Sequence, residues 1–352
     1  MDTNEETTFL SNLPLDILDS ILIRLDLPDL AKCCRTSKAL YPLAKDALYR
    51  DLRLSCNNVL KACQKLTADA DLARRVQTLV LIDNTVQLHL GVIQDALLIL
   101  PNLRTLVLAI GYFGSWILPQ GRKCPFQLHT FRCGFLYDAS TAMFLSSQLL
   151  LKSLAVNSVS SGGEEFRPTH HPCPASYPNL TTLFAPLSVV QDIVPGRPVE
   201  NITTSSSEGD VDPDLLTCLA RSTAPNGVQR FMIDYKYIRS IGGTALARAV
   251  PNLCYLSIDA NDINPAHDKT ISVLTEYVED ILSCLQQMKC ITIRFHPSLS
   301  TLPCRTINFQ DLVTRAFETS PYLKYVIITF FGLRARYVCK SLPGFDWYLC
   351  AD

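Results

Sequence analysis

The chain has 352 residues, of which 48% are hydrophobic and 18% charged, and its formal net charge is −1. This composition is typical of a folded globular protein and excludes a disordered chain. A net charge near zero argues against binding to nucleic acid or to a membrane surface through bulk charge. No secretory signal and no apolar run of about eighteen residues is visible, so we expect a soluble intracellular protein, cytoplasmic and/or nuclear.

The first strong pattern lies in residues 10–52, which read as three short helices. Pro14 suits the first helical position, with Ser11 and Asn12 as candidate caps before it. Leu27–Leu30 breaks this helix and begins a second one, and Ser37 can cap a third. The apolar stripe of the first helix comprises Leu15, Leu18, Leu22 and Leu25, widened by Ile17 and Ile21.

So wide an apolar surface cannot be buried by three short helices alone. A unit of about forty residues is marginally stable by itself and normally packs against something else. Part of the surface should therefore contact the rest of the chain or a separate partner protein.

The order of the anchors in this segment resembles an F-box. F-box segments have an L-P-x-E-I-L opening, a D-L turn, a V-S-K start to the third helix and a closing L-x-R. Asp16 replaces the usual Glu and Thr36 the usual Val, and both replacements are mild. The matching residues are Leu13 to Leu18, Ile21, Leu25, Asp29-Leu30, Thr36-Ser37-Lys38 and Leu48-Tyr49-Arg50.

The resemblance implies that this segment docks on the Skp adaptor of a ubiquitin ligase. The residues expected on that adaptor surface are Leu13, Pro14, Leu15, Ile17, Leu18, Ile21, Leu25, Leu30, Leu43 and Leu48. The alternative is an ordinary helical cap on a larger fold, which explains the amphipathic helices but not the combination of anchors.

Residues 53–75 read as a helical linker, and a six-residue frame, Φ-x-x-Φ-x-Φ with Φ apolar, then recurs ten times. The copies begin at Val76, Leu103, Leu128, Leu151, Leu180, Val199, Val228, Leu253, Met288 and Leu323. A proline stands two residues before four of them, at Pro101, Pro178, Pro251 and Pro321, where it ends a preceding helix and favours an extended entry into the strand. Helices are expected at Val92–Leu100, Gly243–Val250, Ile271–Leu285 and Phe309–Thr319.

Successive copies lie roughly 20 to 35 residues apart, around the range of leucine-rich repeats. Each unit supplies one strand and usually one helix, so neighbours must stack to share a core. We therefore predict an α/β fold with a three-helix F-box followed by an irregular leucine-rich-repeat solenoid over residues 76–341. It resembles the divergent repeats that follow an F-box in many fungal and other eukaryotic proteins. The alternative is an ordinary α/β sheet.

Several segments fall outside the repeat pattern. Ser158–Ser176 and the acidic Ser205–Asp214 read as exposed loops, the second either plainly solvated or a phosphorylation site. Residues 1–9 are expected to be disordered, and residues 342–352 to cap the last repeat.

No motif for catalysis is present: the sequence lacks a P-loop, a dinucleotide-binding G-x-G-x-x-G and H-E-x-x-H. Cys124, His129, Cys133, His170, His171 and Cys173 could be arranged as a zinc set, but none has close paired spacing. The 14 cysteines are scattered without a C-x-x-C pair, so we expect reduced, metal-free thiols. We predict a protein that is not an enzyme and has no cofactor.

Alternation along the strands predicts a target-binding face. The residue between the last two Φ positions and the residue after them should point outward. In the later copies these positions carry polar groups, and we expect target binding by Met232, Asp234, Ser257, Asp259, Thr292, Arg294 and His296. Asp234 and Asp259 would stand about 5 Å apart if their strands are neighbours. Arg294 could compensate them internally, or the acidic pair could receive a basic group from a target.

Three functions follow as alternatives. The resemblance implies the substrate receptor of an SCF-type cullin–RING ubiquitin ligase, bound to the Skp adaptor and through it to a cullin, with a target protein held by the repeats. A non-ligase scaffold that uses the adaptor only as a folding partner is the second alternative, and an α/β enzyme the third. Neither a nucleic-acid nor a membrane partner is expected.

Overall fold

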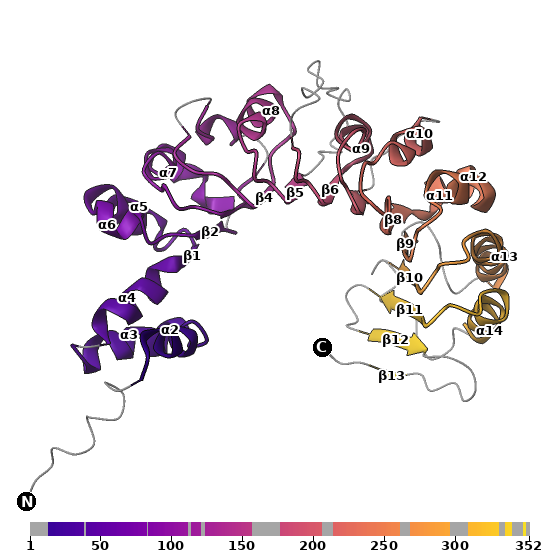
Figure 1. Cartoon of the computed structure of the whole chain (residues 1–352), viewed down its shortest axis with the longest axis horizontal. Helices are drawn as coiled ribbons and strands as arrows, with labels where there is room; N and C mark the ends of the chain where they lie inside the picture. Colours follow the sequence, from indigo (N-terminus) through magenta and orange to yellow (C-terminus); the bar gives the residue numbers. More distant parts are fainter. Residues whose placement is uncertain are drawn as a thin grey trace, which may run out of the picture. The chain divides into compact units, whose positions relative to one another are not determined.

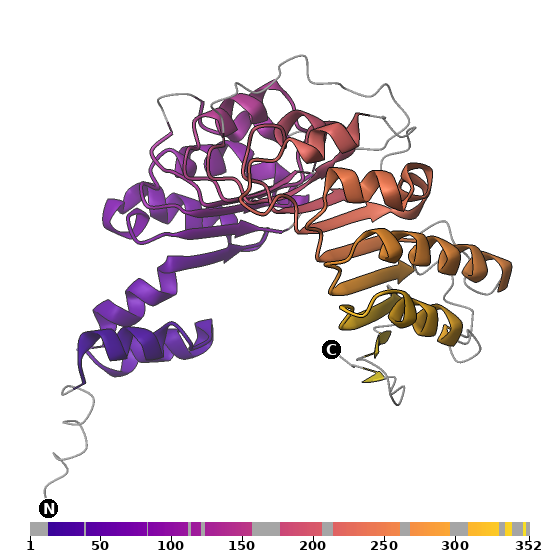
Figure 2. The same cartoon turned by 45° about the vertical axis from the view of Figure 1, so that its right-hand side comes forward.

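The structure is a computed structural model, and the chain divides into two compact units, Met1–Phe135 and Leu136–Asp352, each taken here by itself (Figures 1 and 2). The described residues are 13–38, 40–82, 84–111, 114–120, 124–156, 177–205, 214–260, 268–295, 309–330, 335–339 and 348–349. The expected disordered residues 1–9, the loop 158–176 and most of the expected C-terminal cap lie outside these ranges.

Three helices open the first unit, as expected: α2 (Leu15–Leu22), α3 (Leu27–Thr36) and α4 (Tyr41–Arg50). The Asp26 carboxylate caps α3 by accepting a hydrogen bond from the Asp29 N–H at 3.0 Å. The Ser37 hydroxyl accepts from the Leu40 N–H at 3.3 Å, in the turn that leads into α4. Side-chain acceptors thus satisfy backbone donors at the start of α3 and in the turn before α4, whereas α2 begins after Pro14 without a side-chain cap.

Four parallel strands follow in chain order within the first unit: β1 (Asp51–Leu54), β2 (Thr78–Leu81), β3 (Thr105–Leu108) and β4 (Thr130–Cys133). The segments between them form α5 (Val59–Ala68), α6 (Ala70–Ala73), η1 (Asn84–His89), α7 (Leu90–Leu97) and η2 (Ser115–Ile117). The sequence pattern did not predict β1. The sheet therefore begins at Asp51, and α5 lies between two of its strands.

The second unit continues the same plan. Its parallel strands are β5 (Ser153–Val156), β6 (Thr182–Pro186), β7 (Asn201–Ser205), β8 (Arg230–Asp234), β9 (Tyr255–Asp259), β10 (Cys290–Phe295) and β11 (Tyr325–Phe330). Its helices are α8 (Ala139–Ser146), α9 (Leu187–Ile193), α10 (Leu215–Ala220), α11 (Tyr235–Ile241), α12 (Gly243–Ala249), α13 (Asp268–Cys284) and α14 (Gln310–Thr319). Two antiparallel strands, β12 (Ala335–Cys339) and β13 (Tyr348–Leu349), follow β11.

The core runs along the repeated frame. All three Φ positions are buried in every copy, for example Val76, Leu79 and Leu81 in the first. Burying one such side chain contributes about 1.5–3 kcal/mol, and alternation along each strand aims the last two at the helices. The chain is therefore an α/β protein with a helical N-terminus and a solenoid-like region of stacked strand–helix repeats, as predicted.

The asparagine of the Pro-Asn-Leu signature links successive repeats. Asn102 Nδ2 donates to the Arg74 carbonyl oxygen at 2.6 Å in the first unit, and Asn179 Nδ2 donates to the Leu149 carbonyl oxygen at 2.9 Å in the second. These carbonyls lie in the turn of the preceding repeat. In these two copies the asparagine thus joins its repeat to the preceding turn by a side-chain hydrogen bond.

Helices cover one face of the strands in each unit (Figures 1 and 2). No described helix covers the other face, which we call the open face. Residues of β8 to β11 that alternate with the buried Φ positions, such as Met232 and Ser257, lie on it and are half-buried. Part of this surface is therefore available to a partner.

Candidate interaction surfaces

The N-terminal helices share a small core of their own. Leu22, Leu30, Ala44 and Ala47 are buried together, and Leu25, Cys33, Cys34, Leu43 and Leu48 pack around them. The centre of the apolar stripe on α2, formed by Leu18 and Leu22, is buried. The apolar stripe of α2 is thus wider than the part of it that α3 and α4 cover.

Aliphatic side chains on both flanks of α2 remain exposed. Ile17 and Ile21 lie one helical turn apart and are 44% and 46% exposed, and Leu15 on the other flank is 69% exposed. Scattered exposed apolar residues are normal on a protein surface, but several on one short helix are typical of an interaction site. These exposed residues on the two flanks of α2 form the candidate adaptor surface.

The residues expected to bind the adaptor fall into three groups. Exposed are Pro14, Leu15, Ile17 and Ile21; half-buried are Leu13, Leu25, Leu43 and Leu48; buried are Leu18 and Leu30. Leu18 and Leu30 are therefore core residues of the N-terminal helices in this structure.

The apolar stripe does not include three other exposed apolar residues of this segment, Ile23, Leu27 and Tyr41, each close to half exposed. They stand at helix ends, where the helical periodicity that identified the stripe no longer applies. Only the packing of the three helices distinguishes them from core residues.

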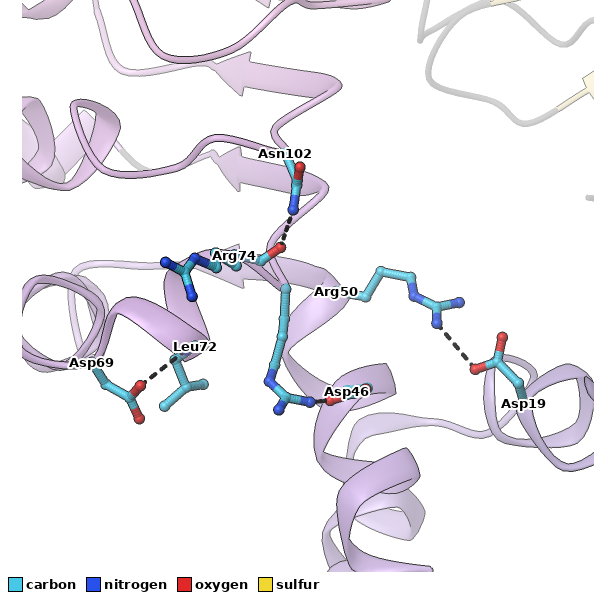
Figure 3. Close-up of polar contacts among 8 residues, drawn as sticks. Asp19, Asp46, Arg50, Asp69, Leu72, Arg74 and Asn102 are labelled. Carbon is cyan, nitrogen blue, oxygen red and sulfur yellow. Dashed lines mark hydrogen bonds and ion pairs between the residues drawn. The ribbon is translucent and has the colours of Figure 1, made fainter. Parts of the chain in front are cut away.

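The helical segment continues directly into the sheet, since α4 ends at Arg50 and β1 begins at Asp51. The Arg50 carbonyl accepts a hydrogen bond from the Gln77 N–H at 2.9 Å, and its guanidinium pairs with Asp19 of α2 at 3.0 Å. Arg75, just after α6, pairs with Asp46 of α4. Figure 3 shows the two ion pairs beside the Asn102–Arg74 bond. These contacts connect α2 and α4 to each other and to the turn before β2, so the orientation of the helices on β1 and β2 is defined.

The candidate target-binding residues lie as the repeat frame predicts in most positions. Strands β8, β9 and β10 are neighbours, with Asp234 in register with Asp259, and Asp259 with Arg294. Met232, Ser257, Asp259, Thr292 and Arg294 are half-buried on the open face. His296 lies outside the described residues.

Asp234 is an exception, and the expectation that it faces a target is wrong. Its side chain is only 5% exposed, and its carboxylate accepts a hydrogen bond from the Lys236 N–H at 2.9 Å, capping α11. Helix α11 begins directly after β8, so the carboxylate is used to satisfy the first turn of that helix. The acidic pair is therefore not available as a single site.

Arg294 provides the compensating charge for Asp259. Burial lowers the pKa of Arg294, and the negative charge of Asp259 opposes that shift. The guanidinium also contacts the Met232 sulfur. These contacts favour the internal, structural role for this charged group over reception of a basic group from a partner.

Among the described residues no group of three His, Cys, Asp or Glu side chains could hold a metal ion. Three members of the considered zinc set, His170, His171 and Cys173, lie outside those ranges. No helix in the described part of the chain is long and apolar enough to cross a bilayer. No disulfide bond joins the ten cysteines whose side chains the structure describes: Cys33, Cys34, Cys56, Cys63, Cys124, Cys133, Cys218, Cys254, Cys284 and Cys290.

Burial should make the thiols react at different rates. Cys63 on α5 is buried, and desolvation raises its pKa to about 11. Since the thiolate is the reactive form, iodoacetamide at pH 8 should modify half-buried Cys56 more than tenfold faster than Cys63, as measured by peptide mass spectrometry. In urea the two rates should converge. Equal rates in the folded protein would contradict the packing of α5.

Comparison with known proteins supports the N-terminal resemblance. Residues 10–55 match the family model described as F-box-like, which covers α2 to α4 and β1. No curated protein matches the chain. The match includes α2, which carries the exposed residues Leu15, Ile17 and Ile21. The chain therefore contains an F-box-like domain at residues 10–55.

Proposed function

We propose that this protein is the substrate-recognition subunit of an SCF-type cullin–RING ubiquitin ligase. The observation that carries the proposal is the coincidence of the F-box-like match at residues 10–55 with exposed Leu15, Ile17 and Ile21 on its first helix. F-box domains generally bind Skp-type adaptors, and aliphatic side chains that remain exposed in the isolated chain gain most from such a contact.

The proposed mechanism requires no catalytic residue in this chain. The F-box-like domain docks on the adaptor, and the repeats, divergent leucine-rich repeats in this proposal, hold the target. Catalysis then consists of raising the local concentration of a target lysine near the conjugating enzyme. The contacts of Arg50 with Asp19 and of Arg75 with Asp46 support the proposal, because they limit the orientations of the first repeats relative to the docked helices. The protein would act in the cytoplasm or nucleus.

Reconstitution tests this function. The full-length chain is co-expressed with a Skp adaptor, mixed with a cullin and analysed by size-exclusion chromatography. We expect one complex containing all three proteins. A complex with the adaptor that excludes the cullin would replace the ligase role with the scaffold role. Failure to bind the adaptor would overturn both.

A further inference from the structure

The open face of the second unit carries a distinctive row of side chains at the N-terminal ends of four neighbouring strands. Arg230, Tyr255, Cys290 and Tyr325 are in register across β8, β9, β10 and β11. Each precedes a buried Φ residue, so alternation places this row on the open face. Arg230, Tyr255 and Cys290 lie two residues before Met232, Ser257 and Thr292, the first outward-facing residues that the repeat frame selected on these strands.

Aromatic and cationic groups are combined in this row. The Arg230 guanidinium lies 4.3 Å from the centre of the Tyr255 ring, and Arg230 itself is exposed. Tyr325 is 38% exposed, while Cys290 between the two tyrosines is buried. This cation–π contact restricts the guanidinium, whose N–H groups can still donate hydrogen bonds to other acceptors.

Two lysines extend the positive charge. Lys289 and Lys324 directly precede β10 and β11, so they lie at the edge of the sheet where these strands begin, and both are exposed. Neither they nor Arg230 form an ion pair with any described residue, whereas Arg315 on α14 pairs with both Asp311 and Glu279.

The acidic residues on or near these strands lie away from the N-terminal ends of β8 to β11 or do not pair with the row. Asp234 and Asp259 end β8 and β9, and Glu318 belongs to the helical layer on α14. Glu200, just before β7, is half-buried and forms no ion pair with Arg230. The N-terminal ends of β8 to β11 therefore carry an excess of positive charge in a chain whose net charge is −1.

We propose that this row, with Lys289 and Lys324, binds a short acidic segment of a target protein; the inference rests on the proposed function and specifies the chemistry of its target. Strands lie about 4.8 Å apart, so β8 to β11 span roughly 14 Å. An extended peptide covers about 3.4 Å per residue, so about four residues cross the row. Arg230 and the two lysines bind carboxylates in that segment, and Tyr255 and Tyr325 pack against its backbone and apolar atoms.

A protein segment suits this surface better than nucleic acid does. Binding to nucleic acid depends on neutralising many phosphates along a basic track. Here there are three cations, Arg230 in the row and Lys289 and Lys324 at the start of β10 and β11, and two tyrosine rings lie among them. This local arrangement fits a segment with a few carboxylates.

The test uses the full-length chain in complex with the Skp adaptor. Its probes are a fluorescein-labelled eight-residue peptide with four central glutamates and the same peptide with glutamines in their place. Fluorescence anisotropy should show binding of the glutamate peptide only, weakening as salt is added. The triple variant Arg230→Glu, Lys289→Glu and Lys324→Glu should lose at least tenfold in affinity.

A matched control reverses three exposed cations on α11 and α12, Lys236→Glu, Arg239→Glu and Arg248→Glu, and should bind the peptide as the parent does. If the first triple variant fails to fold by circular dichroism, glutamine at the same three positions replaces it, with the same expected loss. Equal binding of both peptides, or an equal loss in both triple variants, would overturn the proposal. Tighter binding of a labelled octauridylate than of the glutamate peptide at this row would also overturn it.

Adaptor binding is measured separately on the same proteins. If the parent chain does not bind the adaptor but binds the glutamate peptide by itself, the proposed function is refuted and the acidic-segment site still stands. Retained adaptor binding without peptide binding would refute the acidic-segment site alone.

Discussion

Replacing Ile17 with aspartate should weaken binding to a Skp adaptor on the order of thirtyfold or more. Ile17 is 44% exposed on α2, so the free chain should tolerate the carboxylate. On binding, the carboxylate would be buried in an apolar contact without a partner, which costs about 2–5 kcal/mol. Isothermal titration calorimetry with the purified adaptor measures the loss of affinity. A thermal melt of the free variant should show the melting temperature of the parent.

Val273 provides the matched control for this variant. It is 42% exposed on α13, outside the F-box-like domain, and Val273→Asp should leave adaptor affinity unchanged. If the Ile17→Asp variant binds the adaptor within twofold of the parent, the flank of α2 formed by Ile17 and Ile21 is not part of the adaptor surface. Leu22→Asp should behave differently, because Leu22 is buried in the helical core and its loss should unfold the domain as well.

Gly243→Ala is expected to destabilise the second unit by about 1–3 kcal/mol. Gly243 begins α12, and its N–H donates to Asp280 Oδ2 of α13 at 2.7 Å. A Cβ at this position would lie 2.7 Å from the Asp280 carbonyl oxygen and 2.8 Å from the same carboxylate oxygen. Since the carbonyl belongs to a helix backbone, α12 and α13 must move apart. Urea unfolding measures the change, and hydrogen exchange should locate it in these two helices.

Gly91 is the matched glycine. It lies in α7, and a Cβ built there meets nothing within 4 Å. Gly91→Ala should therefore raise the free energy of unfolding by about 0.5–1 kcal/mol, because alanine loses less backbone entropy in a helix. A Gly243→Ala protein as stable as the parent would show that α12 and α13 do not approach as closely as the structure places them.

The division between F-box-like helices and strand–helix repeats could be derived from the sequence. The frame Φ-x-x-Φ-x-Φ is a local pattern, and its period of two along a strand determines which side chains are buried whatever the neighbours are. For this reason the register of Asp234 with Asp259 and of Asp259 with Arg294 follows from aligning the copies. Pro101, Pro251 and Pro321 likewise follow the ends of α7, α12 and α14, because the covalent geometry of proline cannot continue a helix.

Tertiary structure decided what depends on contacts between distant residues. Strand β1 follows α4 without a break, so the sequence pattern of the helices runs into it, and its pairing with β2, which lies beyond α5 and α6, specifies it as a strand. Asp234 follows the outward-facing alternation, but the helix that begins beside it takes its carboxylate as a cap. On α2, one continuous stripe reads as a single surface, and only the limited area of α3 and α4 leaves Ile17 and Ile21 exposed while burying Leu22. The sequence specifies which residues are apolar, and the space available around each one decides whether it serves the core or a partner.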